Sequence, residues 1–224
     1  MVGLSEFPGF DDAVRMRLAS AVDRLAKEFD GIYERQAIAG LVDESARELS
    51  GGGVTAFVPV IAERFARERL RAQAQAEGRL AKLVPEVLFV SLTGGGRAEI
   101  GAALLARRAG GAVNVHSAGS NVAAEIDSNV RAAMEEVDID LSEAFTKPLT
   151  PEVLSGADVV VTMGRSVGPV EIPTTVRHVD WRVGDPAGAP LPEVRRVRED
   201  IERRVDALAD ELLTPGAAPV TTSA

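Results

Sequence analysis

The sequence predicts an α/β protein in which a four-stranded parallel sheet follows an all-α bundle of three helices. Up to about residue 80, apolar side chains recur at the three- and four-residue spacing of amphipathic helices. From Glu86 onward, short apolar runs alternate with amphipathic segments, which is typical of strands joined by helices in a parallel sheet. A chain of 224 residues is long enough for one large domain or two small ones.

The N-terminal part is predicted to hold three helices. The first carries apolar residues from Leu18 to Ile32 on one face, and the others cover residues 35–49 and 55–77. Three consecutive glycines at 51–53 separate the last two, because glycine loses much backbone entropy inside a helix. A unit of this size buries little apolar surface by itself. Residues 1–80 are therefore either a stabilising appendage or a domain that pairs with a second copy in a homodimer.

The remaining elements follow from the change of period after Glu86. Val87 to Val90 form a continuous apolar run, as expected of a strand covered on both faces. The predicted order after this strand is a glycine-rich turn at 93–96, a helix at 97–108, a strand at 113–116, a helix at 128–137, strands at 158–163 and 175–179, and a helix at 192–213. These elements make a second domain over residues 81–213, and residues 214–224 lack apolar periodicity and are expected to be a disordered tail.

Composition excludes several function classes. The net charge of −9 disfavours binding to nucleic acids or anionic membranes, because the acidic field repels phosphate. No apolar run approaches the length of a membrane span, and no secretory signal is visible, so a cytoplasmic location is expected. The chain has no cysteine, which excludes disulfides, thiolate metal sites and cysteine nucleophiles. We expect no metal and no cofactor.

The segment from Val87 to Ala98 carries the clearest chemical signal. A buried strand leads into three glycines, and a helix then begins at Arg97. Glycines allow successive backbone N–H groups to turn inward as a concave anion nest, and the helix N-terminus adds unpaired donors. Arg97 can bind two oxygens of one anion. The pattern predicts a site for a tetrahedral oxyanion such as phosphate, sulfate or arsenate. The alternative is an ordinary glycine-rich turn with Arg97 in solvent.

These residues resemble the phosphate loop of the low-molecular-weight protein tyrosine phosphatase and arsenate reductase family, in which a cysteine is followed six residues later by an arginine. By this resemblance, Ser91 stands in place of the nucleophilic cysteine and Arg97 is the oxyanion-binding arginine. The similar motifs beyond the loop are HSAGS at 116–120, MEEVDIDL at 134–141, KPLT at 147–150, DVVVTMG at 158–164 and DPAG at 185–188. The resemblance implies the flavodoxin-like fold of that family. The helical N-terminal part is similar to that of some actinobacterial members, where it is thought to dimerise.

The resemblance also implies roles for individual residues. Asp185 falls on the family's general-acid aspartate, which protonates the leaving oxygen. The anion-binding set comprises Ser91, Leu92, Thr93, Gly94, Gly95, Gly96 and Arg97.

Departures from the family pattern point to impaired catalysis. A thiol ionises far more easily than the alcohol of Ser91, and a serine nucleophile needs a neighbouring base. Ala98 replaces a hydroxyl residue, and Gly94 replaces an asparagine that is frequent in the family. His116 and His178 are the only histidines, and both are interpreted as structural residues at strand ends.

The function predicted from the sequence is binding of a small oxyanion by a catalytically impaired homologue, with a possible regulatory role for the dimer. One alternative is an arsenate reductase or protein tyrosine phosphatase, dependent on an external thiol or representing a Cys→Ser form of an active enzyme. A further alternative is a structural dimer module.

Overall fold

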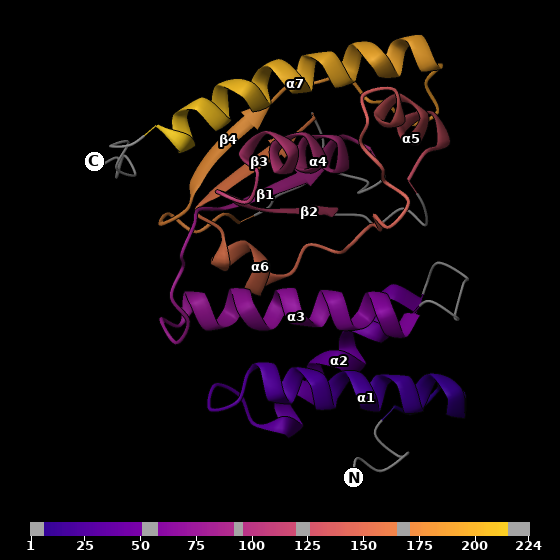
Figure 1. Cartoon of the computed structure of the whole chain (residues 1–224), viewed down its shortest axis with the longest axis vertical. Coiled ribbons are helices and arrows are strands. Elements are labelled where there is room, and N and C mark those ends of the chain that lie inside the picture. Colours follow the sequence, from indigo (N-terminus) through magenta and orange to yellow (C-terminus); the bar gives the residue numbers. More distant parts are fainter. Residues whose placement is uncertain (1–6, 51–57, 92–95, 120–125, 165–170, 215–224) are drawn as a thin grey trace. The chain divides into compact units, whose positions relative to one another are not determined.

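The computed structural model describes residues 7–50, 58–91, 96–119, 126–164 and 171–214. The chain divides into two compact units, residues Met1–Ala81 and Lys82–Ala224 (Figure 1). Within the described ranges, no helix is both long and apolar enough to cross a lipid bilayer. The tail predicted to be disordered lies almost entirely outside the described residues, which end at Thr214.

The first unit is a bundle of three helices, as predicted. They are α1 (Asp12–Glu28), α2 (Arg35–Leu49) and α3 (Val58–Ala76). The side chain of Asp11 starts α1 by accepting a hydrogen bond from the backbone N–H of Val14 at 2.9 Å. Apolar residues of all three helices form one core, including Leu18 from α1, Val42 from α2 and Ala66 from α3. Packing of these faces holds the unit together, since isolated helices of this length are marginally stable.

The second unit is built on four parallel strands. They are β1 (Glu86–Ser91), β2 (Asn114–Gly119), β3 (Val159–Met163) and β4 (Arg177–Trp181), in the order β2-β1-β3-β4. Ser91 lies opposite Gly119 of β2 and Met163 of β3. The predicted sheet is thus confirmed, and Ser91 lies at the carboxyl end of a central strand, beside the point where strand order reverses.

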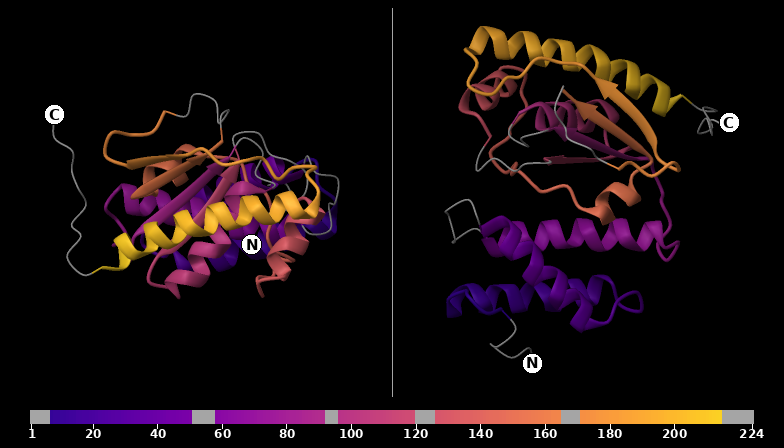
Figure 2. Two further views of the ribbon diagram at one scale, coloured as in Figure 1. Left: turned by 90° about the horizontal axis from the view of Figure 1, so that it is seen from above. Right: turned by 180° about the vertical axis from the view of Figure 1, so that it is seen from behind.

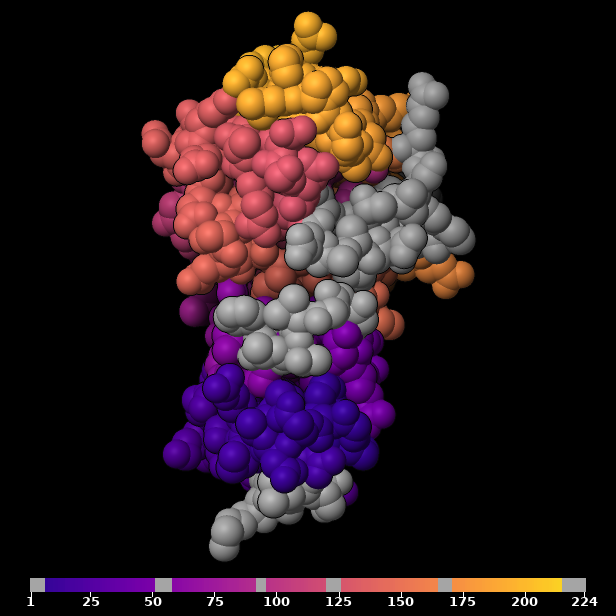
Figure 3. Space-filling model, turned by 90° about the vertical axis from the view of Figure 1, so that its right-hand side faces the viewer, coloured from indigo at the N-terminus to yellow at the C-terminus, as the bar shows by residue number. Residues whose placement is uncertain are grey.

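Helices cover the two faces of this sheet. They are α4 (Arg97–Ala109), α5 (Ser128–Glu135), α6 (Pro151–Gly156) and α7 (Leu191–Leu213). The long α7, in yellow, runs along the face that also carries α4, whereas α6 lies on the other side (Figures 1 and 2). Side chains of α7 lie against those of α5 (Figure 3). Phe89 of β1 packs against Gly101 of α4, where a Cβ atom would lie 2.8 Å from the ring.

Two features of the sheet unit differ from the prediction. The helix α6 was not expected, because six residues beginning with a proline are too short to show a helical period. The last strand begins at Arg177 rather than at residue 175. It is an edge strand whose residues are mostly exposed, so its apolar pattern is weak.

Candidate anion site

Ser91 is the last residue of β1 and is almost fully buried. Its exposed fraction is 1%, and its Oγ has no hydrogen-bond partner within the described part of the chain. A buried hydroxyl without a partner costs about 1–3 kcal/mol relative to a satisfied one. The position therefore favours an additional acceptor near the carboxyl end of β1.

The loop after Ser91 is only partly described. Leu92, Thr93, Gly94 and Gly95 of the predicted anion-binding set lie outside the described residues. Gly96 is described and forms the N-cap of α4. A Cβ atom at Gly96 would lie 2.8 Å from Cγ of Pro186, so this position has no room for a larger residue unless Pro186 moves.

Arg97 begins α4, and its side chain is 8% exposed. The guanidinium lies against Gly164, the residue that follows β3. Gly164 has a φ of +95°, and a Cβ atom there would lie 2.4 Å from Nη1 of Arg97. Both its backbone conformation and the neighbouring guanidinium therefore require glycine at position 164. The sequence did not predict this role of Gly164, although the residue ends the DVVVTMG motif at 158–164.

Asp185 is brought next to Arg97. Its Oδ2 lies 3.3 Å from Nη2 of Arg97, and its side chain is 54% exposed. The other carboxylate oxygen accepts a hydrogen bond from the backbone N–H of Ala187 at 3.2 Å. Residues separated by 88 positions therefore meet as an ion pair, of which one member is buried and the other faces solvent.

The segment after Asp185 is anchored to the start of α5. Asp127 caps α5 by accepting from the N–H of Asn129 at 2.8 Å, and its second oxygen accepts from the N–H of Gly188 at 3.0 Å. The Asn129 side chain donates to the carbonyl of Ala189 at 2.9 Å. The sequence did not predict this anchor. An Asp residue just before a helix is an N-cap signal, but it does not indicate the contact with Gly188.

The two histidines form hydrogen bonds remote from Ser91. His116 Nε2 lies 2.9 Å from Oε2 of Glu86, at the start of β1. His178 Nε2 lies 2.8 Å from Oγ1 of Thr162. His116 is paired with Leu88, three residues before Ser91, which places it about 10 Å away along the strand. Neither ring is placed to act as a base for Ser91, which agrees with a structural role, but His116 is the third of six residues in β2 and does not lie at a strand end as predicted.

Glu99 is a buried acid in the first turn of α4. It is 3% exposed, and neither carboxyl oxygen has a hydrogen-bond partner in the described residues. Burial raises the pKa of Glu99 to about 8. The backbone N–H groups of Glu99 and Gly96 and the charge of Lys147 lower the pKa in part, without making a hydrogen bond of normal geometry. Glu99 therefore carries its proton through most of the physiological pH range.

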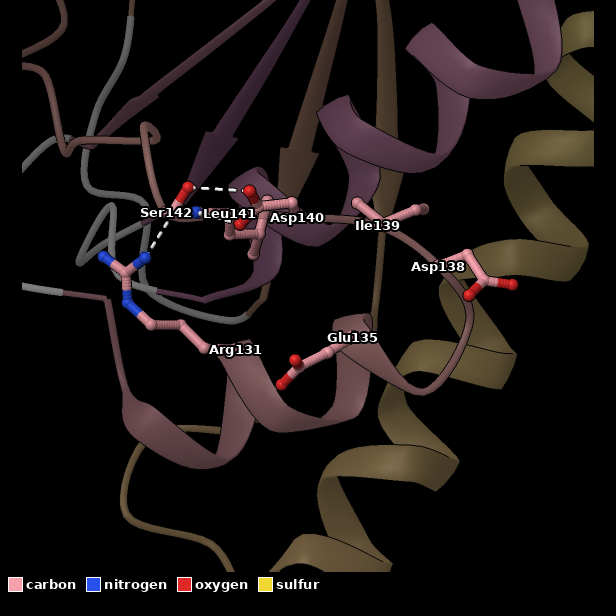
Figure 4. A pocket seen from close by; sticks show the side chains of 7 residues that line it. All are labelled: Arg131, Glu135, Asp138, Ile139, Asp140, Leu141 and Ser142. Carbon is pink, nitrogen blue, oxygen red and sulfur yellow. Dashed lines mark hydrogen bonds between the residues drawn. The ribbon is translucent and has the colours of Figure 1, made fainter.

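A separate cavity of about 450 Å³ lies beside α5 (Figure 4). Its lining residues are Arg131, Glu135, Asp138, Ile139, Asp140, Leu141 and Ser142. The Arg131 side chain donates to the carbonyl of Leu141, and Asp140 accepts hydrogen bonds from the N–H and hydroxyl of Ser142, each at 2.7 Å. The two hydrogen bonds from Ser142 lower the pKa of Asp140. The polar groups stabilise the turn after α5, and Ser91, Gly96, Arg97 and Asp185, the predicted site residues that the structure describes, do not line the cavity.

Among the residues that the structure describes, no cluster of acidic or histidine side chains could hold a metal ion. Ser91, Arg97 and Asp185 contribute one hydroxyl, one guanidinium and one carboxylate near the carboxyl ends of the strands, and the last two form an ion pair.

Two family models match the chain. Residues 18–74 match the N-terminal domain described as protein-tyrosine-phosphatase-like, and residues 86–215 match the low molecular weight phosphotyrosine protein phosphatase. An arsenate reductase of Brevibacillus brevis is 39% identical over 104 residues, which are 45% of this chain and 76% of that protein.

Two similar solved structures are also described as arsenate reductases. The Corynebacterium glutamicum thioredoxin-dependent arsenate reductase Cg_ArsC1′ matches with a TM-score of 0.76 and 32% identity, over 87% of this chain and 95% of that one. A structure described as an arsenate reductase in the phosphate binding state matches with a TM-score of 0.54 and 27% identity, over 58% of this chain and 99% of that one.

The burial of Glu99 predicts a specific dependence of stability on pH. The folded chain keeps this proton up to about pH 8, whereas the unfolded chain releases it near the ordinary value of 4.5. Between these values the unfolded state binds fewer protons, so the free energy of unfolding falls as pH rises. We expect Glu99→Gln to remove this fall. Between pH 5 and pH 8, the free energy of unfolding of the variant should therefore rise by about 4 kcal/mol relative to that of the unmodified chain.

Urea denaturation at pH 5, 6.5 and 8 measures this difference. Glu193→Gln is the matched control, because Glu193 is the third residue of α7 as Glu99 is of α4, but is exposed. The control should keep the pH dependence of the unmodified chain. Equal slopes for Glu99→Gln and the unmodified chain would show that Glu99 is ionised in the folded state.

Proposed function

We propose that this chain, a member of the low-molecular-weight phosphotyrosine protein phosphatase family in which Ser91 replaces the nucleophilic cysteine, binds a tetrahedral oxyanion and has lost the catalysis of its relatives. The proposed ligand is phosphate, sulfate or arsenate. The proposed contacts are Ser91, Arg97 and the backbone N–H groups of residues 92–97, with Asp185 at the opening. A cytoplasmic location belongs to the same proposal.

The placement of Arg97 carries the proposal. A cation at the N-terminus of a helix is unfavourable, because the unpaired N–H groups there already carry partial positive charge. Arg97 is the first residue of α4, and its side chain is nearly buried. Among the described residues, the counter-ion of Arg97 is Asp185, whose side chain is more than half exposed and therefore contributes little to stabilising the buried charge. The local field therefore favours a further anion, and one similar arsenate reductase is described in a phosphate-binding state.

Loss of catalysis is supported by the surroundings of Ser91. A serine hydroxyl attacks phosphorus or arsenic only when a base removes its proton. Both histidines are engaged with other residues away from Ser91, and Asp185 faces Arg97. In the described part of the chain no side chain hydrogen-bonds to the Ser91 hydroxyl. Among the residues that the structure describes, no group is placed to activate this nucleophile, which supports anion binding without catalysis.

Anion binding is tested by isothermal titration with phosphate, sulfate and arsenate. We expect the unmodified chain to bind all three, and Arg97→Ala to bind about ten- to a hundredfold more weakly, since hydrogen bonds to charged groups contribute about 1.5–3 kcal/mol. Arg182→Ala is the control, because Arg182 is 84% exposed and should leave the affinity unchanged. If the unmodified chain binds none of the three anions, the structural-module alternative is favoured instead.

The second candidate function is arsenate reduction with an external thiol. The pairing of Asp185 with Arg97 favours it, because this carboxyl could protonate an oxygen that leaves a bound arsenate. Arsenate would gain two electrons and leave as arsenite, while two thiols become one disulfide. The chain itself contributes no thiol to this reaction.

Turnover measurements separate these candidates. We expect the unmodified chain to hydrolyse no p-nitrophenyl phosphate and to reduce no arsenate, with or without a low-molecular-weight thiol. Ser91→Cys should raise phosphate-ester hydrolysis at least about tenfold, because a thiol ionises far more readily than an alcohol. Ser91→Ala controls for background activity. Thiol-dependent arsenate reduction by the unmodified chain would establish the second candidate and refute the loss of catalysis.

The homodimer expected from the sequence remains part of the proposal. Two large apolar side chains of the helical unit are exposed, Met16 of α1 at 58% and Val60 of α3 at 55%. Exposed apolar residues of this size on two helices are suitable for burial in a second copy. A dimer would present two anion sites in one particle, which is suited to a regulatory role.

Sedimentation equilibrium tests the oligomeric state. We expect a mass of twice 23.6 kDa, and a shift toward 23.6 kDa in the variant that carries Met16→Lys and Val60→Lys together. Leu83→Lys is the control, because Leu83 is 91% exposed and lies outside the three helices. A monomer at all concentrations would remove the dimer from the proposal and leave anion binding intact.

A further inference from the structure

The buried acid Glu99 lies beside the same backbone groups that the anion is proposed to use. Gly96 is the N-cap of α4, and Glu99 is three residues later. A glutamate at this helical position points back toward the N-cap, where it can reach the N-cap N–H. The backbone N–H groups of Gly96 and Glu99 both act on this carboxyl. The carboxyl and an anion held at Gly96 would therefore share one donor.

An ionised Glu99 and a dianion bound near the start of α4 would repel each other, and the nearby cations among the described residues are few. Lys147 is the cation that acts on Glu99 from the segment before α6, and its Nζ lies 5.7 Å from the ring centre of Phe145. Arg97 is on the same helix as Glu99 and is paired with Asp185. Glu99 is 3% exposed, so water screens its charge poorly. An ionised Glu99 would repel a dianion bound at Gly96 and Arg97.

We propose that Glu99 is part of the anion site and acts there as a neutral acid: a tetrahedral dianion binds beside Gly96 and Arg97 only while the Glu99 carboxyl keeps its proton. This inference rests on the proposed function. The Glu99 carboxyl is buried and has no hydrogen-bond partner among the described residues. When it is protonated, it can donate a hydrogen bond to an oxygen of the bound anion. No covalent bond forms to the anion, and any proton that the Glu99 carboxylate takes up on binding comes from the buffer.

The inference also defines the class of ligand. The O–H groups of Ser91 and protonated Glu99 donate, as do the N–H groups of Gly96 and Arg97. A site rich in donors fits best an anion whose oxygens all accept, such as sulfate. An oxygen that carries a proton, as in the phosphate dianion, finds only uncharged acceptors among these four groups, the hydroxyl oxygen of Ser91 and the carbonyl oxygen of Glu99. Asp185 is the described carboxylate that could accept such a proton, and it lies on the exposed side of Arg97.

Sulfate is the suitable probe, because its charge does not change between pH 7 and pH 9. Glu99 is mostly protonated at pH 7 and mostly ionised at pH 9 in the free chain. We expect the sulfate affinity of the unmodified chain to fall about tenfold between these two values, since each pH unit above the pKa removes most of the protonated form. Binding at pH 9 should take up about one proton, measured by titration calorimetry in two buffers of different ionisation enthalpy.

Glu99→Gln should bind sulfate equally well at pH 7 and at pH 9 and take up no proton. Glu193 is exposed, so Glu193→Gln should behave as the unmodified chain does. Sulfate binding that is independent of pH in the unmodified chain would overturn the role of Glu99 while leaving the anion site in place. The same holds if Glu99→Gln keeps the pH dependence. Absence of sulfate binding at pH 7 would overturn both the anion site and the role of Glu99. If Glu99→Gln fails to fold, proton uptake by the unmodified chain decides the question.

Discussion

The organisation of the site depends on the burial of one positive charge, the guanidinium of Arg97. Removing such a group from water is costly, and its position at the start of α4 adds unfavourable interaction with the helix dipole. Three parts of the fold make this placement possible. Gly164 provides space for the guanidinium after β3, Asp185 supplies a nearby carboxylate, and Gly96 allows the Asp185 segment to approach through Pro186. All of them lie at the carboxyl ends of the strands or at the N-terminus of the helix that follows.

The parts of the site that could be predicted are those encoded within one short segment. The run from Val87 to Val90, the glycines after it and the start of a helix at Arg97 are local signals, and the structure has β1 and α4 where the sequence predicts them. Asp185 could be assigned only through the resemblance to a family. No composition or period indicates that a carboxylate 88 residues away will lie 3.3 Å from Arg97.

The features that sequence reasoning missed all depend on tertiary contacts. Asp127 is recognisable as a helix cap, but its second oxygen binds Gly188 only because α7 and α5 pack together. Glu99 has the sequence signature of an exposed first-turn acid, as Glu193 has in α7, and only the fold buries one and exposes the other. Likewise, Gly164 is one of several glycines in the sequence until the guanidinium is found against it.

In the proposed function, replacement of the family's cysteine by Ser91 removes the nucleophile but keeps the groups that would attract an anion. The nucleophile contributed reactivity, whereas the field at the carboxyl end of β1 comes from the helix N-terminus and Arg97, which do not depend on sulfur. Ser91 and Glu99 are both buried with polar atoms that lack partners in the described residues. In the proposed anion site, an anion with several acceptor oxygens would supply the hydrogen-bond partner that each of these two groups lacks. This is the physical argument for anion binding over the alternative of a structural dimer module.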